Sequence, residues 1–467
     1  MLYQVYPRSF ADSDGDGVGD LRGITSRLDH FEWLGIAGLW LSPTFPSPNA
    51  DWGYDVADYY GVHPELGTLD DLDELIAEAR RRGIRILLDL VPNHTSDHHA
   101  WFTERPDFYL WRDSVPNNWR SIFTKESAWR YDARRGKYYL HLFTPQQPDL
   151  DWWNPEVRDE FDRILRFWFE RGVAGFRIDV AHGIVKDEEL RDNREYRDGD
   201  PAWVKRLGHW NDRSMNQPGT HEVFRRWQRI AHEFDGEKPI LVGETVVTDL
   251  DLMASYYGNG TDELDLAFNF AFAYADFDLD VLRGVVEETE RLLPADAWPV
   301  WTASNHDMSR AMTRWAGGDE RKARAILFLL LTLRGTPVLY QGEELALEDG
   351  AVPPDRVLDP AEPSRDPCRT PIPWTRSGDE WRDPWLPLAD TTRNVEDERA
   401  DTGSTLHHVR DLIARRRAFV GEPYETLPSR AGVWAWRRGA TTIALNLTDD
   451  EAEHGGRTLA PWEGAIL

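Results

Sequence analysis

Apolar runs of strand length alternate with stretches of helical spacing along most of this chain. Residues 2–6, 38–42 and 84–91 are short and largely apolar, as is typical of strands that are buried on both faces of a parallel sheet. Between them, residues 24–34 and 69–82 carry apolar side chains at helical spacing, and a glycine follows each stretch. This order predicts a parallel sheet that is covered by helices.

The alternation resumes after residue 148 and raises the number of predicted strands to eight. A helix is predicted at 157–171, where the apolar side chains again form one stripe. The later strands are predicted at 175–180, 240–243, 264–268, 300–304 and 338–340. Eight strands with intervening helices favour a (β/α)8 TIM barrel, an α/β fold whose functional groups lie at the C-terminal ends of its strands.

Two segments depart from this alternation. The first, residues 93–148, is rich in Trp, Tyr, His and Pro without a helical period, which predicts a small subdomain inserted after the third strand. The second, residues 403–467, is expected to form a helix and then a small antiparallel β-domain, because its short alternating runs are separated by turn residues. The predicted domains are the barrel at 1–92 and 149–402, the inserted subdomain B at 93–148, and the terminal helix with the C-terminal β-domain at 403–467.

Two long polar loops are expected at the C-terminal face of the barrel. One covers residues 183–220 after the fourth strand, and the other covers residues 342–400 after the eighth. Loops at this end of a barrel carry and surround the functional site. We therefore expect both loops to shape the entrance for a ligand.

The charge of the chain limits the partners that it can have. Its 54 basic and 82 acidic residues give a net charge of −28, which repels nucleic-acid phosphates and anionic lipids but not an uncharged ligand. No apolar stretch reaches the roughly 18 residues that a membrane span requires. From the N-terminal residues we expect no signal peptide, and the single cysteine, Cys368, excludes an internal disulfide. We expect a cytoplasmic protein without nucleic-acid or membrane partners; the sequence leaves its oligomeric state undetermined.

Four short segments near the ends of predicted strands carry acidic residues. They read Asp-Leu-Val-Pro-Asn-His at 89–94, Gly-Phe-Arg-Ile-Asp-Val at 175–180, Gly-Glu-Thr at 243–245 and Ser-Asn-His-Asp at 304–307. Within them, Asp179, Glu244 and Asp307 follow predicted strands four, five and seven. A single acidic residue at a strand end commonly caps a helix. Three carboxylates that meet at one barrel mouth can instead cleave a glycosidic bond.

The neighbours of these carboxylates fit two different catalytic roles. Arg177 lies two residues before Asp179, so on a strand both side chains point to the same face. A fixed cation there would keep Asp179 ionised, as a nucleophile requires. Glu244 follows an apolar strand, whose surroundings favour the protonated form that a general acid requires.

The four segments resemble those of the α-amylase superfamily of retaining glycoside hydrolases. Gln147-Pro148-Asp149-Leu150 resembles the marker of its oligo-1,6-glucosidase and α-glucosidase branch. Further matches are Tyr-Gln-Val-Tyr-Pro-Arg-Ser-Phe at 3–10, Tyr-Asp-Val-Ala-Asp-Tyr at 54–59 and Cys-Arg-Thr-Pro at 368–371. The resemblance spans nearly the whole chain in the order that the family has.

The resemblance implies a retaining α-glucosidase that removes glucose from the non-reducing end of short oligosaccharides. Asp179 would be the nucleophile that forms a covalent glucosyl intermediate, Glu244 the acid/base, and Asp307 a third carboxylate that binds sugar hydroxyls. Tyr54 would stack on the glucose ring, and Arg369 would close the pocket. The residues expected to border or contact the sugar are Asp51, Tyr54, His94, Arg177, Val180, His306 and Arg369.

The sequence leaves the linkage and the acceptor open. Val180 after the nucleophile resembles members that act on α-1,6 bonds, whereas Gly-Glu-Thr at 243–245 resembles members that act on α-1,4 bonds. His182 departs from the Asn that is common nearby in the α-1,6 group. A transglucosidase or an isomerase of the trehalose synthase or sucrose isomerase type would use the same intermediate. A carbohydrate-binding relative without activity is the less favoured alternative, because all three carboxylates are present.

An acidic loop near the N-terminus has the spacing of a cation site. Oxygen ligands at positions 1, 3, 5 and 9, the backbone oxygen of position 7 and a glycine at position 6 resemble the start of an EF-hand loop. These positions are Asp12, Asp14, Asp16, Gly17, Val18 and Asp20. Gly23 stands where that loop has its last Glu. The alternative is an acidic loop that caps the next helix, but the resemblance implies a structural Ca²⁺, with Mg²⁺ as the other candidate.

Overall fold

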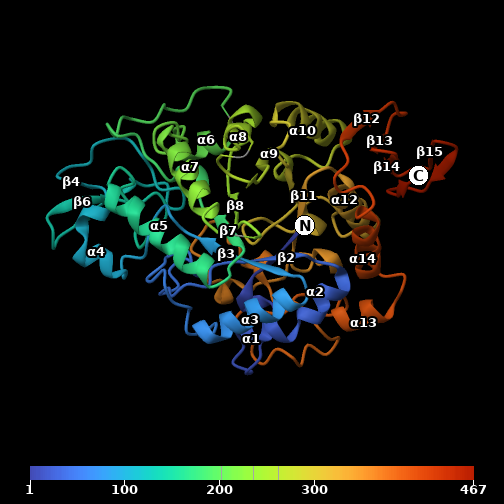
Figure 1. Ribbon diagram of the computed structural model, residues 1–467, viewed down its shortest axis with the longest axis horizontal. Helices are drawn as coiled ribbons and strands as arrows, with labels where there is room; N and C mark the ends of the chain where they lie inside the picture. Colours follow the sequence, from blue (N-terminus) through green and yellow to red (C-terminus); the bar gives the residue numbers. More distant parts are fainter. Residues whose placement is uncertain (201, 235, 261) are drawn as a thin grey trace.

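The computed structural model describes residues 1–200, 202–234, 236–260 and 262–467. Within these residues, eight parallel strands form one sheet in the order β10-β11-β1-β2-β3-β7-β8-β9. Figure 1 labels β2, β3, β7, β8 and β11 of this sheet. The strands are β1 (Leu2–Val5), β2 (Gly38–Leu41), β3 (Arg85–Leu90), β7 (Gly175–Ile178), β8 (Ile240–Gly243), β9 (Leu266–Ala267), β10 (Val300–Trp301) and β11 (Thr336–Tyr340). A parallel bridge between Phe268 and Val300 joins the two ends of the sheet. The predicted barrel is therefore confirmed.

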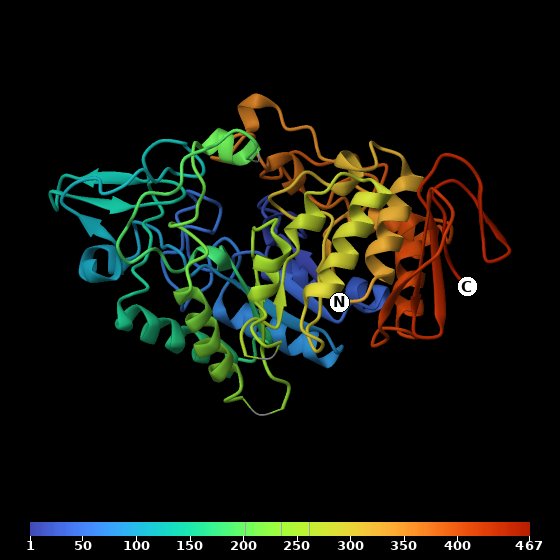
Figure 2. The same ribbon diagram turned by 90° about the horizontal axis from the view of Figure 1, so that it is seen from above.

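Helices follow the strands and surround the barrel (Figures 1 and 2). They include α1 (Leu21–Ser26), α2 (Leu28–Leu34), α3 (Leu69–Arg81), α5 (Pro155–Glu170), α7 (Gly219–Ala231), α8 (Leu250–Ser255), α10 (Leu279–Leu292) and α12 (Glu320–Thr332). The helix predicted at 69–82 is confirmed as α3, which begins with a capping box between Thr68 and Asp71. Among the described residues, none of the helices combines the length and the apolar character that crossing a bilayer requires.

The prediction of one continuous helix over residues 24–34 is wrong. The structure has two short helices, α1 and α2, which are separated at Arg27. The side chain of Asp20 accepts a hydrogen bond from the amide of Gly23 and starts α1 earlier than predicted. Ser26 then donates its hydroxyl back to the carbonyl of Gly23, a local bond that competes with continued helix.

Residues 93–148 contain their own antiparallel sheet, at the edge of the molecule (Figure 2). Its strands are β4 (Trp111–Arg112), β5 (Trp129–Asp132) and β6 (Lys137–Leu140), and a short helix, α4 (Ala100–Glu104), precedes them. The side chain of Val180, from the barrel, belongs to the same buried cluster as Leu110, Trp129 and Leu140. The inserted segment therefore shares one apolar cluster with the residue that follows Asp179.

The two long segments predicted as loops contain some regular structure. Residues 183–220 include α6 (Ala202–Leu207), whereas residue 201 lies outside the described residues. Residues 342–400 end in α13 (Val395–Ala400) and carry short 3-10 turns, one of them at Asp366–Arg369. Polar capping residues within these segments start short helices; Asn394, for example, caps α13.

The C-terminal part begins with α14 (Thr405–Arg416) and continues in antiparallel sheets. Their strands are β12 (Tyr424–Leu427), β13 (Val433–Arg438), β14 (Thr441–Asn446), β15 (Ala452–His454), β16 (Arg457–Leu459) and β17 (Gly464–Ile466). Arg416 and Arg438 are buried and donate hydrogen bonds to carbonyls at the C-terminal end of α12, among them those of Leu331 and Thr332. These bonds satisfy the free carbonyls of that helix and attach the β-sheets to the barrel.

Candidate active site

The acidic segments meet at the C-terminal end of the barrel because they follow neighbouring strands. Asp89 at the end of β3 is the pairing partner of Arg177 on β7, and Arg177 is also paired with Val242 on β8. Asp179 and Glu244 come directly after β7 and β8. Parallel neighbours in register thus bring these side chains to one edge of the sheet.

The guanidinium of Arg177 joins three carboxylates. Its Nη1 lies 2.8 Å from Asp89 and 2.8 Å from Asp179, and its Nη2 lies 2.7 Å from Glu244. All four side chains are buried. Asp179 and Glu244 are therefore held no farther apart than one guanidinium can span, which is compatible with a retaining pair.

The electrostatic environment of Asp179 differs from the sequence-based prediction. Burial raises the pKa of Asp179 well above its ordinary value, and the charges of Glu244 and Asp89 add to this effect. Arg177 acts in the opposite direction. Burial also raises the pKa of Asp89 to about 7. The prediction that Asp179 stays ionised considered only the attraction of Arg177. It did not include the fact that this one cation pairs with three carboxylates.

A strained turn connects Asp179 to Glu244. Val180 has φ = 44°, in the left-handed region that a β-branched residue rarely adopts. In this conformation its amide donates to Oε2 of Glu244 at 2.9 Å, and the amide of Ala181 donates to the Glu244 carbonyl at 3.0 Å. The turn after β7 therefore holds the side chain and the backbone of Glu244.

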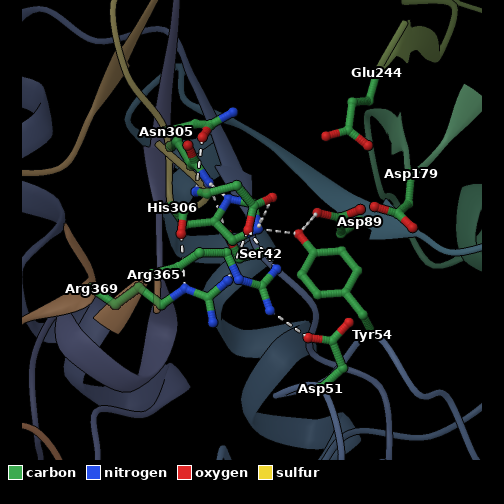
Figure 3. Close-up of polar contacts among 12 residues, drawn as sticks. Ser42, Asp51, Tyr54, Asp89, Asp179, Glu244, Asn305, His306, Arg365 and Arg369 are labelled. Carbon is green, nitrogen blue, oxygen red and sulfur yellow. Dashed lines mark hydrogen bonds and ion pairs between the residues drawn. The ribbon is translucent and has the colours of Figure 1, made fainter. Parts of the chain in front are cut away.

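A second group of charges surrounds Asp307 and Asp51. Arg365 lies 2.9 Å from Asp307 through Nη1. Its Nη2 lies 2.7 Å from Asp51 (Figure 3). Arg365 also pairs with buried Asp359 at 2.6 Å. Arg369 reaches Asp307 at 2.8 Å. In this group Arg365, and not Arg369, connects Asp51 with Asp307.

Asp307 is the carboxylate whose ionised form the surrounding charges stabilise most clearly. Burial opposes its ionisation, yet its pKa lies far below the ordinary value. Burial lowers the pKa of His306 and keeps that imidazole neutral, so we attribute the lowered pKa of Asp307 to Arg365 and Arg369. Asp307 is thus ionised over the whole neutral range.

A chain of hydrogen bonds runs from the first strand to Asp89. Nδ1 of His306 lies 2.7 Å from Nε2 of Gln4, and Nε2 of His306 lies 2.5 Å from the hydroxyl of Tyr54. The hydroxyl of Tyr54 in turn donates to Asp89 at 3.1 Å (Figure 3). The rings of Tyr54 and His306 are stacked, with their centroids 5.4 Å apart. The bonds are mutually consistent when Nε2 of His306 carries the proton.

His94 lies on the Asp51 side of the site. Nε2 of Gln147 is 3.1 Å from Asp51 and 3.0 Å from Nε2 of His94. Burial lowers the pKa of His94 to about 4, so this side chain is neutral above that pH. The structure therefore brings the expected contact residues Asp51, Tyr54, His94, Arg177, His306 and Arg369 to one end of the barrel.

A buried ion pair joins the segments that lie next to His94. The ammonium of Lys186 lies 2.9 Å from Asp149, and both side chains are buried. Lys186 also donates to the side chain of Asn93 and to the carbonyl of Gly183. Asn93 lies next to His94, and Gly183 belongs to the turn that follows Asp179, so one ammonium connects three segments of the site.

Sequence reasoning missed Arg365, Asp359 and Lys186. Arg365 lies only four residues before Arg369, and a second arginine in the same segment was a signal that could have been followed. No periodicity distinguishes the two arginines, because the segment consists of turns. Lys186 and Asp149 are 37 residues apart, and their pairing depends on how the inserted segment packs on the barrel.

The acidic loop before α1 brings three of its carboxylates together. Oxygen atoms of Asp12, Asp14 and Asp20 lie within 4.8 Å of one another. Among the described residues, the carboxylate of Asp16 does not belong to this group; it accepts a hydrogen bond from the amide of Val18 at 2.8 Å. Three hard oxygen donors fit Ca²⁺ or Mg²⁺.

Comparisons with known proteins agree with this geometry. The family described as the alpha amylase catalytic domain matches residues 4–420. A probable alpha-glucosidase of Rhizobium meliloti (strain 1021) is 40% identical, over 90% of this chain and 82% of its own length. An oligo-1,6-glucosidase of Parageobacillus thermoglucosidasius is 35% identical, over 89% of this chain and 83% of its own.

The solved structures agree as well. The crystal structure of an alpha-glucosyl transfer enzyme superposes with a TM-score of 0.92 at 34% identity, covering 100% of this chain and 98% of that one. Family, relatives and fold coincide over nearly the whole chain. The protein is therefore an enzyme that belongs to the α-amylase family of glycoside hydrolases.

Proposed function

We propose that this enzyme is a retaining α-glucosidase that releases glucose from the non-reducing end of short oligosaccharides with α-1,4 or α-1,6 bonds. The observation that carries this proposal is the shared guanidinium of Arg177, which holds Asp179 and Glu244 together at the barrel mouth. The named α-glucosidase and oligo-1,6-glucosidase relatives support the substrate class.

The reaction would proceed in two displacements. A carboxylate oxygen of Asp179 attacks the anomeric carbon, the bond from that carbon to the glycosidic oxygen breaks, and Glu244 gives its proton to the departing oxygen. Water then attacks the same carbon and gives a proton to Glu244, while the bond to Asp179 breaks. Two inversions release glucose in the α-configuration.

Several buried carboxylates share one cation at the proposed reaction centre. Arg177 stabilises negative charge on Asp179, while burial and the neighbouring acids favour keeping one proton in the group. A nucleophile and an acid need one ionised and one protonated carboxyl at the same pH, and competition of several carboxylates for one cation favours retention of a proton within the group. The assignment of that proton to Glu244 comes from the proposed mechanism. Asp307, which is ionised, would accept hydroxyl hydrogen bonds from the sugar.

The charged residues around Arg365 support a closed pocket, in which the enzyme would remove one terminal glucose at a time. Arg365 links Asp51, Asp307 and Asp359 by ion pairs, and these pairs form a continuous group of charges beside the site. A wall there would admit the terminal glucose and exclude a polymer that continues in that direction. Arg365 would then be the residue that closes the pocket, with Arg369 holding Asp307.

A transglucosidase or an isomerase is the second candidate. The superposed alpha-glucosyl transfer enzyme supports it, because such an enzyme shares the covalent step. The two functions differ only in whether water or a sugar hydroxyl attacks the intermediate. Product analysis on maltose, isomaltose, sucrose and trehalose separates them: glucose alone favours the hydrolase, and new disaccharides favour the transferase.

We further propose that Asp12, Asp14 and Asp20, with the backbone oxygen of Val18, hold a structural Ca²⁺, or Mg²⁺ in its place. The convergence of three carboxylates supports this proposal. The site lies in the loop before α1, and the ion would stabilise that loop without taking part in the reaction.

Asp179→Asn tests the proposed nucleophile. An amide cannot form the glucosyl ester, so turnover of p-nitrophenyl α-glucoside should fall at least about 10³-fold, while the circular dichroism spectrum and the Tm are kept. Asp113→Asn is the matched control, because Asp113 is an exposed aspartate of the inserted segment that pairs with Lys137. Substantial residual kcat in Asp179→Asn, or failure of wild type on every α-glucoside, would contradict the proposal.

A further inference from the structure

The segment after β9 emerges between the strands of Glu244 and Asp307. In the barrel β9 is paired with β8, and Phe268 continues it to the bridge with Val300 at the start of β10. The hydroxyl of Thr245, next to Glu244, donates to the carbonyl of Phe268 at 3.0 Å. The chain beyond Phe268 therefore lies at the barrel mouth on the Glu244 side. It forms the short helix α9 (Phe270–Ala273) and its C-terminal neighbour, Tyr274.

Tyr274 combines two properties that rarely occur together. Its side chain is 52% exposed, although it is large and aromatic. Burial nevertheless raises the pKa of its hydroxyl, and the charges of Glu244 and Asp307 raise it further. A large aromatic ring that is exposed at the barrel mouth leaves a face available for a ligand. The effect of Glu244 and Asp307 on the pKa of Tyr274 agrees with a ring on the side of the mouth where these carboxylates lie.

Buried aromatic side chains pack against the ring of Tyr274. The ring of Phe270 lies 5.4 Å from that of Tyr274, centroid to centroid, at an interplanar angle of 36°. Phe270 is buried and packs on Phe268, which packs on Trp40 inside the barrel. Val246, two residues after Glu244, adds a second exposed apolar side chain at 37%. The Glu244 side of the mouth is thus apolar and partly rigid.

We propose that the ring of Tyr274 is the platform on which the leaving sugar, or an accepting sugar, stacks beyond the cleaved bond. This rests on the proposed function, because Glu244 must protonate the glycosidic oxygen, and groups beyond Glu244 then face the leaving group. The apolar face of a sugar ring suits an aromatic face, and the uncharged sugar is not repelled by the carboxylates. Tyr274 would determine which acceptors and linkages are used, without taking part in bond cleavage.

Three substrates measured on four variants test this inference. α-Glucosyl fluoride has a leaving group too small to reach a platform, whereas maltose has a whole sugar there. Tyr274→Ala should lower kcat/KM for maltose about tenfold and leave that for α-glucosyl fluoride within about twofold, on the scale of one lost apolar contact. With p-nitrophenyl α-glucoside as donor and glucose as acceptor, the ratio of transfer to hydrolysis should fall by a similar factor. Tyr274→Phe should keep wild-type values.

The controls separate stacking on Tyr274 from a general effect of removing an exposed aromatic ring. Tyr131 on β5 is 53% exposed, so Tyr131→Ala matches the change in type and exposure and should alter none of these values. Tyr274→Leu keeps an apolar side chain of useful size without an aromatic face and should resemble Tyr274→Ala, which covers the case of a poorly folded Ala variant. Equal losses on both donors, no loss, or a Phe variant as poor as Ala would overturn the inference while leaving the α-glucosidase assignment intact. A wild type that turns over no α-glucoside would overturn both.

Discussion

The amide of Val180 donates a hydrogen bond of 2.9 Å to the side chain of Glu244, across 64 positions of the chain. Val180 itself has a left-handed backbone, so the chain turns sharply directly after this amide. Val180 follows the proposed nucleophile, and its hydrogen bond therefore fixes the position of the proposed acid, Glu244. A change in the side chain of Val180 leaves the amide in place but alters the apolar surface beside both carboxylates.

Val180→Ala should change the ratio of kcat/KM for isomaltose to that for maltose by about tenfold, the scale of a small apolar contact near the leaving group. Loss of two buried methyl groups should also lower the free energy of unfolding by roughly 1–3 kcal/mol. Leu190→Ala is the control, because Leu190 is buried in the same cluster and also has a positive φ. It should lower stability without changing the ratio. An unchanged ratio in Val180→Ala would remove this residue from linkage selection.

Glu244→Gln should be slow mainly on substrates with poor leaving groups, because only these need a proton as they depart. The first step should fall about 10²–10⁴-fold for maltose and much less for an aryl glucoside with an activated leaving group. Rapid-quench measurement of the first turnover provides both values. Equal losses for the two substrates would show that Glu244 is not the acid.

Asp89→Asn should move the acidic limb of the kcat/KM profile to lower pH. The negative charge that Asp89 carries above its own pKa of about 7 raises the pKa of Asp179, so an uncharged amide should lower that pKa in this range and allow the nucleophile to ionise at lower pH. The profile is measured with p-nitrophenyl α-glucoside. Asp162→Asn, which breaks a pair with Arg226 on the outer helices, should leave it unchanged. A limb that stays in place or moves upward contradicts this account of the carboxylate group.

Lys186→Met should lower the free energy of unfolding by about 3–5 kcal/mol, because it leaves the carboxylate of Asp149 buried without its cation. Lys186→Met combined with Asp149→Asn should recover part of this loss, since Asn still accepts from the amide of Leu142. Lys238→Met, which breaks a partly exposed pair with Asp265, should cost about 1 kcal/mol or less. Urea unfolding measures all three. Equal costs for Lys186→Met and Lys238→Met would contradict a special role of the buried pair.

Asp14→Ala should remove a bound divalent cation and lower the Tm, without a specific loss of kcat at low temperature. The physical reason is the loss of one of three convergent carboxylates. Asp16→Ala should have the smaller effect, because that carboxylate lies outside the group. Elemental analysis and Tm with and without chelator provide the test. Wild-type protein that carries no stoichiometric Ca²⁺ or Mg²⁺ would show that the loop is only acidic.

The elements that depend on local periodicity were predictable. The strand over residues 84–91 and the helix over 69–82 correspond to β3 and α3, because their apolar residues repeat with the period of the element that buries them. The helix over 24–34 was mispredicted, because Asp20 caps an earlier start and Ser26 bonds back to Gly23 where α1 ends, within an unbroken apolar pattern. Periodicity reports which face is buried and does not report such side-chain bonds.

Asp179, Glu244 and Asp307 could be selected as candidates from the sequence, because strand ends of a barrel converge whatever the details of packing. The protonation states of these carboxylates could not be predicted from the sequence. The pKa of Asp179 depends on its distances to Arg177 and Asp89, which lie on different strands, and on the exclusion of water from all of them. The same holds for Arg365, whose pairing with Asp51 spans 314 positions. The sequence by itself determined the fold and the candidate carboxylates, through local pattern and order along the chain. The tertiary structure alone decided which charges face one another, because electrostatic energies follow distances in space and not positions in the chain.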